Sequence, residues 1–373
     1  MVLGAHLAAQ QDANQRIAIY LPHTFIGIWA RCGWAGVDLF FVLSGFLVSG
    51  LLFNEYKKHG KVEVGRFLIR RGFKIYPAFY VFLLSTLGID LFLRFVRHWR
   101  EVPGIGAPGF GAYLCEALFV QNYGLHTWPH TWSLAVEEHF YLLLGLGVFL
   151  LSRRFAGRAD NPFSFIPYFF IFAVPALLVV KLINVHLHPP SLYPDGGWRC
   201  NCIFTHLRFD SLLFGVVLSY ISIFHTEETA LAVKRYSLII LVSSCMLVSI
   251  CGVISQWTAF MYTIGFCLLY LGFGGLVMLM IHWDIGTSRL AGVLKPIGLI
   301  GYYSYSIYLW HFAVRVGCDV LEARFFGRHA ISPTFGAIAY VAGSILVGIA
   351  AAKIVEVPFL RLRDRLFPSR AVG

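Results

Sequence analysis

The stretch His130–Leu151, HTWSLAVEEHFYLLLGLGVFLL, joins a polar, aromatic loop to an apolar run. Glu137 and Glu138 lie next to each other near the start of a segment whose composition predicts a membrane helix. At helical spacing their side chains point about 100° apart, so both carboxylates cannot face the same partner. Ionisable groups at membrane depth usually face a bundle interior or a wet cavity and are functional by default. The alternative is a helix end at the headgroup level with both acids in water.

The composition of the whole chain defines its class. Of its 373 residues 58% are hydrophobic and 13% charged, and the mean hydropathy is +0.71. These values exclude a pair of soluble domains and predict an all-α, polytopic integral membrane bundle. The net charge of +11 does not require nucleic acid, because basic loops orient a chain in a bilayer, and we expect no nucleic-acid partner. No linker or internal repeat divides the chain, so we expect one membrane-embedded domain over 1–373.

The apolar runs predict about ten transmembrane helices. The first run, Met1–Ala9, is far too short to cross a hydrocarbon core of about 30 Å, and we expect it to be the outer half of a truncated first helix. The other predicted spans are Gly33–Phe53, Ile75–Phe95, Trp132–Leu151, Phe163–Ile183, Ile203–Phe224, Tyr236–Ile254, Phe260–Ile281, Ile297–Val316 and Phe335–Val355. A short apolar piece, Ala112–Val120, lies between two of them.

Basic residues predict the orientation of these spans. The loop after the second span is rich in lysine and arginine, which places it on the cytoplasmic side. Alternation then puts the basic tail inside, and it puts Arg324 and Arg328 in an outer loop. We therefore expect a multi-pass protein of a bacterial inner membrane, with both termini cytoplasmic.

The cysteines do not indicate a metal site. The chain has eight, of which Cys245, Cys251 and Cys267 lie in apolar runs where they suit small core positions. Cys200 and Cys202 lie in a loop, but their spacing suits neither a relaxed disulfide nor a four-ligand zinc site. We expect no bound metal and no bound cofactor.

Two single residues near the start of the chain are candidates for chemistry. His6 lies on the short first run, and a neutral imidazole near mid-membrane suits a general base. The alternative for His6 is a packed helix residue bonded to a neighbour. Asp38 lies in an apolar helix that carries Ser44 and Gly45 further along, and a carboxylate at that depth requires a partner. Ser44 and Gly45 are small enough to permit close contact between helices.

The segment Arg66–Tyr80, RFLIRRGFKIYPAFY, carries a basic cluster. Arg70 and Lys74 are four residues apart, and Arg71 and Lys74 three apart, so these side chains project on neighbouring helix faces with Arg66 one turn away. Such a cluster can bind phosphates, above all through bidentate arginine contacts. The alternatives are a purely topogenic role or anionic-lipid binding.

Two later segments also carry polar residues into apolar helices. Arg208 and Asp210 lie at the outer end of a predicted span. Ser304, Tyr308 and His311 fall on one helical face and are further cavity candidates. Both sets are also compatible with satisfied packing networks. The segment 355–366, VEVPFLRLRDRL, is interpreted as an anchor on the inner membrane surface.

Taken together, these segments resemble the membrane acyltransferase 3 family, whose members O-acylate sugars, polysaccharides and other hydroxylated molecules. The matching stretches occur in the family's order and cover nearly the whole chain. They are GVDLFFVLSGFL, RRGFKIYP, HTWSLAVEEHFYL, LRFDSLLFG, YSYSIYLWH and VEVPFLRLRD.

The resemblance implies roles for particular residues. The family's first helix carries an arginine and, eleven residues later, a histidine taken as catalytic; VLGAH matches the histidine end, so His6 inherits that role. The arginine would fall before Met1, which we expect to reflect a late start in the gene model. The family's two arginines three residues apart, associated with acyl-CoA, correspond here to Arg71 and Lys74, and lysine lacks the planar fork.

The expected function is therefore membrane O-acylation. The basic cluster would hold the phosphates of acyl-CoA, expected to be acetyl-CoA, and His6 would take the proton of an acceptor hydroxyl on a carbohydrate or related molecule. Glu137 or Glu138 would orient the base. Arg208 could stabilise the oxyanion in place of the missing arginine. Two alternatives remain: a transporter or flippase of a glycan or lipid-linked substrate, and a catalytically defective member of the same fold.

Overall fold

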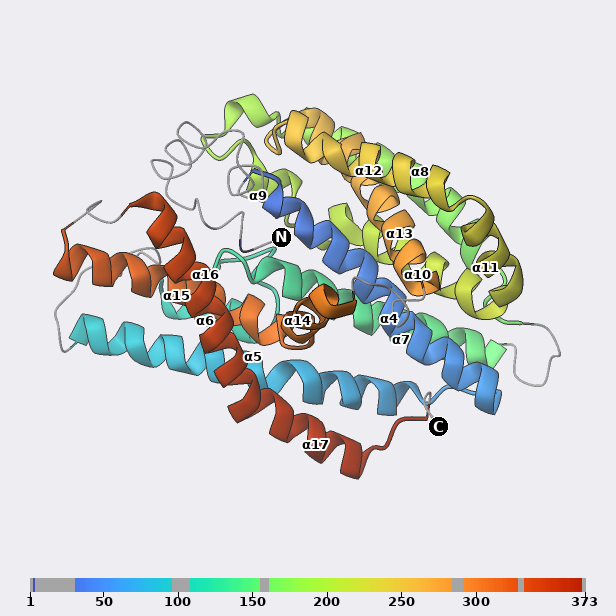
Figure 1. The fold of residues 1–373 in the computed structure, drawn as a ribbon, viewed down its shortest axis with the longest axis horizontal. Coiled ribbons are helices and arrows are strands. Elements are labelled where there is room, and N and C mark those ends of the chain that lie inside the picture. The colour runs from blue at the N-terminus through green and yellow to red at the C-terminus, as the bar shows by residue number, and fades with distance from the viewer. Residues whose placement is uncertain are drawn as a thin grey trace. The chain divides into compact units, whose positions relative to one another are not determined.

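The computed structural model describes residues 3, 31–95, 108–154, 161–283, 291–327 and 332–370. These residues form helices and no strands, so the all-helical prediction is confirmed (Figure 1). The α-helices are α4 (Gly36–His59), α5 (Val64–Phe95), α6 (Phe110–Ala117), α7 (Trp132–Arg154), α8 (Ile166–Leu187), α9 (Trp198–Asn201), α10 (Thr205–Phe224), α11 (Thr226–Arg235), α12 (Ser237–Val253), α13 (Phe266–His282), α14 (Ala291–Tyr302), α15 (Ser304–Phe325), α16 (Pro333–Ala351) and α17 (Val357–Leu366). Shorter helical turns are η1 (Gly33–Ala35), η2 (Pro190–Leu192), η3 (Met261–Gly265) and η5 (Ala352–Glu356).

Seven helices in the described residues are long and apolar enough to cross a membrane. They are Gly33–His59, Val64–Phe95, Trp132–Arg154, Ile166–Leu192, Thr205–Phe224, Met261–His282 and Thr334–Leu366. The pair α11 and α12, bent by 78°, makes an eighth if it counts as one span. The chain is thus a multi-span membrane protein.

The predicted number of spans, about ten, stays a prediction. Met1–Ala9 lies, apart from Leu3, outside the described residues. The predicted span Ile297–Val316 is wrong in its boundaries, because the helix is interrupted at Tyr303 and α15 continues to Phe325 through charged residues. By length and composition α15 is not among the helices that could cross a membrane in the described residues.

The described residues fall into two compact units. The α4–α10 unit comprises Ala35–Ile69, Ser133–Trp283 and Ser369–Gly373, and the α15–α16 unit comprises Met1–Trp34, Arg70–Trp132 and Asp284–Pro368. The continuous helix α5 passes from one unit to the other. That the whole chain acts as one domain stays a prediction.

Small residues bring α4 and α10 together in the α4–α10 unit. A Cβ atom added to Gly45 would lie 2.0 Å from the Leu212 carbonyl oxygen, and one added to Gly215 would lie 2.2 Å from the Val42 carbonyl oxygen. The two backbones therefore touch, as the small residues of α4 predicted. Ser44, one residue before this contact, shares a hydrogen bond of 2.5 Å with the Tyr141 hydroxyl on α7.

The outward faces of the helices are apolar, as expected for a protein surrounded by lipid. On α8 the side chains of Phe169, Phe172 and Ile183 are exposed by 52, 76 and 54%. A water-soluble protein rarely exposes such a continuous apolar surface. At the polar end of α4, Gly60 adopts φ +66° and ends the helix in a left-handed cap that glycine takes without strain.

Candidate functional site

A buried ion pair joins α4 to α10 in the α4–α10 unit. The Arg208 guanidinium donates a hydrogen bond of 2.6 Å to Asp38, and the two side chains are 2% and 1% exposed. The Arg208 Cζ atom also lies 3.8 Å from the centre of the Phe266 ring. Both charges were predicted to need partners, and the structure shows that each has the other across 170 residues of sequence. The predicted alternative of a satisfied network describes this arrangement.

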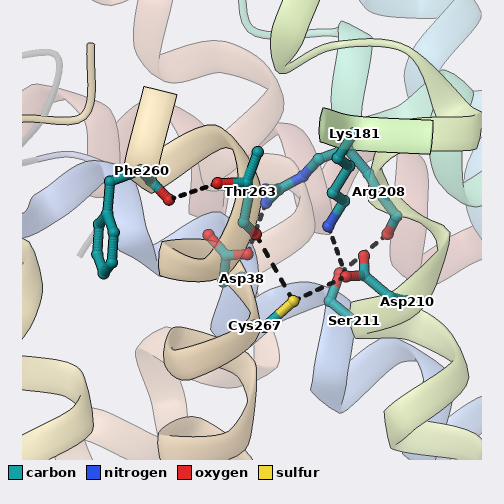
Figure 2. A network of polar contacts seen from close by, with 8 residues as sticks. All are labelled: Asp38, Lys181, Arg208, Asp210, Ser211, Phe260, Thr263 and Cys267. Carbon is teal, nitrogen blue, oxygen red and sulfur yellow. Dashed lines mark hydrogen bonds and ion pairs between the residues drawn. The ribbon is translucent and has the colours of Figure 1, made fainter. Parts of the chain in front are cut away.

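A second pair lies beside the first. Lys181 of α8 donates a hydrogen bond of 2.5 Å to Asp210 of α10, and both side chains are almost fully buried. Figure 2 shows Lys181, Asp210 and the Cys267 thiol converging, with the thiol 3.7 Å from the same carboxylate. Two acids and two bases thus neutralise one another in a setting where an unpaired charge is very costly. We call Asp38, Lys181, Arg208 and Asp210 the charge network.

Sequence reasoning missed Lys181. The signal was present, because it is a single lysine inside the apolar stretch FFIFAVPALLVVKLINV, 169–185. An intramembrane lysine should have been matched to a nearby acid, and Asp210 was available. The hydroxyl groups around the charge network bond mainly to backbone: Ser211 donates to the Arg208 carbonyl at 3.0 Å, and Thr263, in the π-helical turn η3, donates to the Ala259 carbonyl at 2.8 Å.

Glu137 and Glu138 both lie buried on α7, with 3% and 7% of their surface exposed. Burial excludes the alternative in which both acids lie in water. The next residue, His139, shares a hydrogen bond of 2.7 Å with the Thr205 hydroxyl at the start of α10. Their predicted role toward His6 stays a prediction, because His6 lies outside the described residues.

In the α15–α16 unit, acidic residues at the end of the chain hold two members of the predicted basic cluster. Lys74 pairs with Glu356 at 2.9 Å, and Arg70 pairs with Asp364 at 3.0 Å and also donates to the Phe367 carbonyl. Arg66 and Arg71 lie on the same helix, α5, and both are partly buried. Lys74 keeps 32% of its side chain exposed and Arg70 keeps 19%.

Glu356 corrects the interpretation of 355–366 as a surface anchor. The carboxylate is 3% exposed, and it accepts a hydrogen bond of 2.6 Å from Ser306 while it pairs with Lys74. It belongs to the π-helical turn η5, and such turns are frequent at functional sites. The helix therefore continues from α16 through η5 into α17, and its acid faces the bundle.

The predicted face of α15 is only partly as expected. His311 is fully buried, Tyr308 is half-buried, and Ser304 is exposed, whereas the buried serine of this segment is Ser306. Ser304 precedes the buried part of the helix because it forms the first turn of α15.

The structure adds His130 to this group. The Tyr308 hydroxyl donates a hydrogen bond of 2.5 Å to the His130 carbonyl, and the His130 and His311 rings lie 4.8 Å apart, edge to face. His130 is the first residue of the HTWSLAVEEHFY stretch, in which only the two carboxylates were predicted to be functional. Two imidazoles and a phenol thus meet in the α15–α16 unit.

A buried carboxylate, Glu116 of α6, fixes the loop that carries His130. It accepts hydrogen bonds from the backbone of Thr127 at 3.1 Å and Trp128 at 2.9 Å, and from the Thr131 hydroxyl at 2.7 Å. Burial nevertheless raises the pKa of Glu116 to about 7, although these hydrogen bonds act in the opposite direction. This carboxyl is another residue that sequence reasoning did not select.

No group of three or more His, Cys, Asp or Glu side chains in the described residues is placed to hold a metal ion. The cysteines of that part of the chain are free thiols. Its buried polar groups are instead ion pairs, carboxylates, imidazoles and hydroxyls. Side chains of these kinds can carry protons and bind oxygen-containing ligands. The protein is therefore a polytopic membrane protein with polar centres among its helices.

Comparison with known proteins gives the family. The chain matches the family model described as "Acyltransferase domain" over residues 1–353. It therefore belongs to the membrane acyltransferase 3 family, and the resemblance is confirmed. The chain is a membrane-embedded acyltransferase domain.

Two relatives show how far the similarity extends. The chain is 25% identical to "O-acetyltransferase OatA" of Staphylococcus aureus (strain NCTC 8325 / PS 47), over 77% of this chain and 47% of that protein. It is 28% identical to "Putative O-acetyltransferase SACOL0978" of Staphylococcus aureus (strain COL), over 77% of this chain and 46% of that protein. The chain thus spans about half the length of the curated relatives it matches. No solved structure matches it.

Proposed function

We propose that this chain transfers an acyl group, in the first instance acetyl, from acyl-CoA to a hydroxyl of a carbohydrate or related acceptor. The observation that carries the proposal is the family match over nearly the whole chain, together with relatives named as O-acetyltransferases. The thioester C–S bond breaks, an ester C–O bond forms, and the hydroxyl proton passes by way of a base to the departing thiolate. CoA and the O-acyl product are released.

The basic cluster on α5 is the donor site of this proposal. Lys74 and Arg70 remain partly exposed while Glu356 and Asp364 hold their other sides, which keeps both cations oriented. The phosphates of CoA match arginine and lysine donors. Arg66 and Arg71 would add to this site. The positive loops favour a donor site on the cytoplasmic side of a bacterial inner membrane, where acyl-CoA is available, and the proposal puts both termini on that side.

His6 is the general base of the proposal, by its match to the family's first-helix motif. Glu137 or Glu138 would hold a base in the correct orientation, and their burial on α7 is compatible with that task. The charge network would keep α4, α8 and α10 in place relative to one another. Arg208 is committed to Asp38 and to the Phe266 ring, which favours this organising role over that of an oxyanion donor.

A transfer assay tests the proposal. Membranes that contain the full chain are mixed with labelled acetyl-CoA and a panel of methyl glycosides, and the labelled glycoside is detected by mass spectrometry. We expect His6→Ala to lower transfer about 10²- to 10⁴-fold, the usual contribution of a general base. His59→Ala, which removes an exposed histidine at the end of α4, is the matched control and should keep full activity.

Three outcomes would contradict the proposal. Full transfer by a folded His6→Ala protein would reject His6 as the base. Movement of an unmodified glycan across the membrane, with no label transferred, would favour the transporter alternative. A wild-type protein that neither transfers label nor moves glycan would favour the catalytically defective alternative.

A further inference from the structure

The helices α15 and α16 pack backbone to backbone in an antiparallel pair (Figure 1). A Cβ atom added to Gly348 would lie 2.5 Å from the Ile307 Cα atom, and one added to Gly343 would lie 3.2 Å from the Val314 side chain. Residue numbers therefore fall along α16 as they rise along α15. This register decides which side chains of the two helices lie level with each other.

Polar side chains line this contact. On α15 they are His311, Arg315 and Asp319, which are spaced four residues apart and so share one helix face. On α16 they are Tyr340 and Ser344, also four residues apart. The Arg315 Cζ atom lies 5.9 Å from the centre of the Tyr340 ring, and by the register Ser344 lies level with His311. We call these five side chains the polar seam.

Two hydroxyls of the polar seam are buried with no partner except each other. Tyr340 and Ser344 are both 0% exposed, and within the described part of the chain neither hydroxyl bonds to any group apart from the contact between the two. Several helical serines elsewhere in the described chain bond to backbone, as Ser49 does to the Gly45 carbonyl at 2.6 Å and Ser222 to the Leu218 carbonyl at 2.8 Å, whereas the buried Ser219 of α10 makes no such bond. A buried polar group without a partner costs free energy, so the folded chain retains these two hydroxyls at a disadvantage.

The polar seam becomes more exposed toward one end. Ser344 and Tyr340 are fully buried, whereas the Arg315 side chain is 13% exposed and that of Asp319 is 29% exposed. Arg315 and Asp319 form an ion pair of 3.2 Å. The more exposed end of the polar seam therefore carries the ion pair, and the buried end carries the two hydroxyls.

We propose that the polar seam is the acceptor subsite, which binds the hydroxyl groups of a carbohydrate or similarly hydroxylated molecule; this inference rests on the proposed function. The Tyr340 and Ser344 hydroxyls can each donate and accept a hydrogen bond, as sugar hydroxyls do. The Arg315–Asp319 pair offers donors and acceptors to a second, neighbouring hydroxyl. Such a ligand would fill the hydrogen-bonding capacity that Tyr340 and Ser344 do not use with each other.

The place of the polar seam in its unit agrees with this role. Leu3, three residues before His6 in the sequence, packs against Tyr340. The donor cluster lies toward the other end of the same continuous helix, because Glu356 follows Tyr340 by 16 residues, or about 24 Å of helix. The charge pattern of the sequence assigns the Asp319 end to the outer side. Acceptor and donor therefore approach from opposite ends.

Removal of the two hydroxyls tests the inference. We measure acetyl-CoA-dependent acylation of methyl glycosides for Tyr340→Phe, Ser344→Ala and the double variant, and we determine KM separately for glycoside and acetyl-CoA. Each single variant should raise the glycoside KM about 2- to 10-fold, the value of one hydrogen bond, with the acetyl-CoA KM and the thermal stability unchanged. Tyr80→Phe and Ser243→Ala, whose hydroxyls bond to the Ala117 and Ile239 carbonyls, are the matched controls and should leave the glycoside KM unchanged.

The outcomes separate the inference from the proposed function. Transfer by the wild-type protein with equal glycoside KM in wild type and in the double variant overturns the acceptor subsite and leaves the proposed function intact. A rise in both KM values, or in the control variants as well, assigns the hydroxyls a structural role and also overturns the subsite. A wild-type protein that transfers label to no glycoside counts against the proposed function, and the subsite fails with it.

Discussion

The charge network and the polar seam treat buried polar groups in opposite ways. In the charge network every charge faces an opposite charge at 2.5 or 2.6 Å, and the helices that carry them are held by those contacts. In the polar seam two fully buried hydroxyls have no partner within the described residues except each other. The difference teaches that burial alone does not identify a binding site. A polar group that its own chain satisfies organises the fold, and one left unsatisfied is placed for a ligand.

The largest expected effect comes from breaking one pair of the charge network. Arg208→Met leaves Asp38 buried beside an apolar side chain, and loss of one partner of a buried pair typically costs about 3–5 kcal/mol. Thermal unfolding in detergent should show this loss, and the double variant Asp38→Asn/Arg208→Met should recover most of it. Tyr340→Phe, in contrast, should leave the unfolding temperature unchanged or raise it. Equal stability of the single and double variants would show that the pair does not hold the fold.

A smaller, pH-dependent effect is expected at Glu116, a buried group with several partners in the same unit as the polar seam. Its folded-state pKa of about 7 lies above the ordinary value of 4.5, so the folded protein holds the proton more tightly than the unfolded chain. Stability should therefore fall as the pH rises from 4.5 through 7 and level off above. Glu116→Gln, which mimics the protonated form, should remove this part of the slope in unfolding measurements at several pH values. Parallel curves for the two proteins would contradict it.

The smallest effect is expected at the donor end of the α16–α17 helix. Lys74→Ala removes a partly exposed cation from the proposed donor site, where a solvent-accessible contact to a phosphate is worth at most about 1 kcal/mol. The acetyl-CoA KM should rise about two- to fivefold with the glycoside KM unchanged, the reverse of the result expected for Tyr340→Phe. Lys74→Arg keeps the charge and serves as the control. A change in the glycoside KM alone would place Lys74 on the acceptor side instead.

Some of the site could be predicted from single residues. Asp38, Arg208 and Asp210 were selected because an ionisable side chain in an apolar run must find a partner. Lys181 met the same criterion and was overlooked, and with it the second ion pair. Tyr340 and Ser344 could not be found in this way, because tyrosine and serine are ordinary in membrane helices and usually bond to neighbouring backbone.

Glu356 shows why a local pattern can mislead. The residues after it, PFLRLRDRL, are basic and amphipathic, and that pattern is typical of a helix on a membrane surface. The pattern reports only neighbours along the chain. Ser306 and Lys74, which hold the carboxylate, lie 50 and 282 residues away.

The sequence by itself determined that the chain is an all-helical membrane protein of the acyltransferase family, because hydropathy and ordered motifs are properties of contiguous residues. Only the tertiary structure decided which acid faces which base and which hydroxyls face none. The physical reason is that a buried charge or hydroxyl is stabilised by whatever the fold brings within about 3 Å of it. For Asp38 that partner is 170 residues away, and for Tyr340 the described chain offers none beyond Ser344 on the same helix.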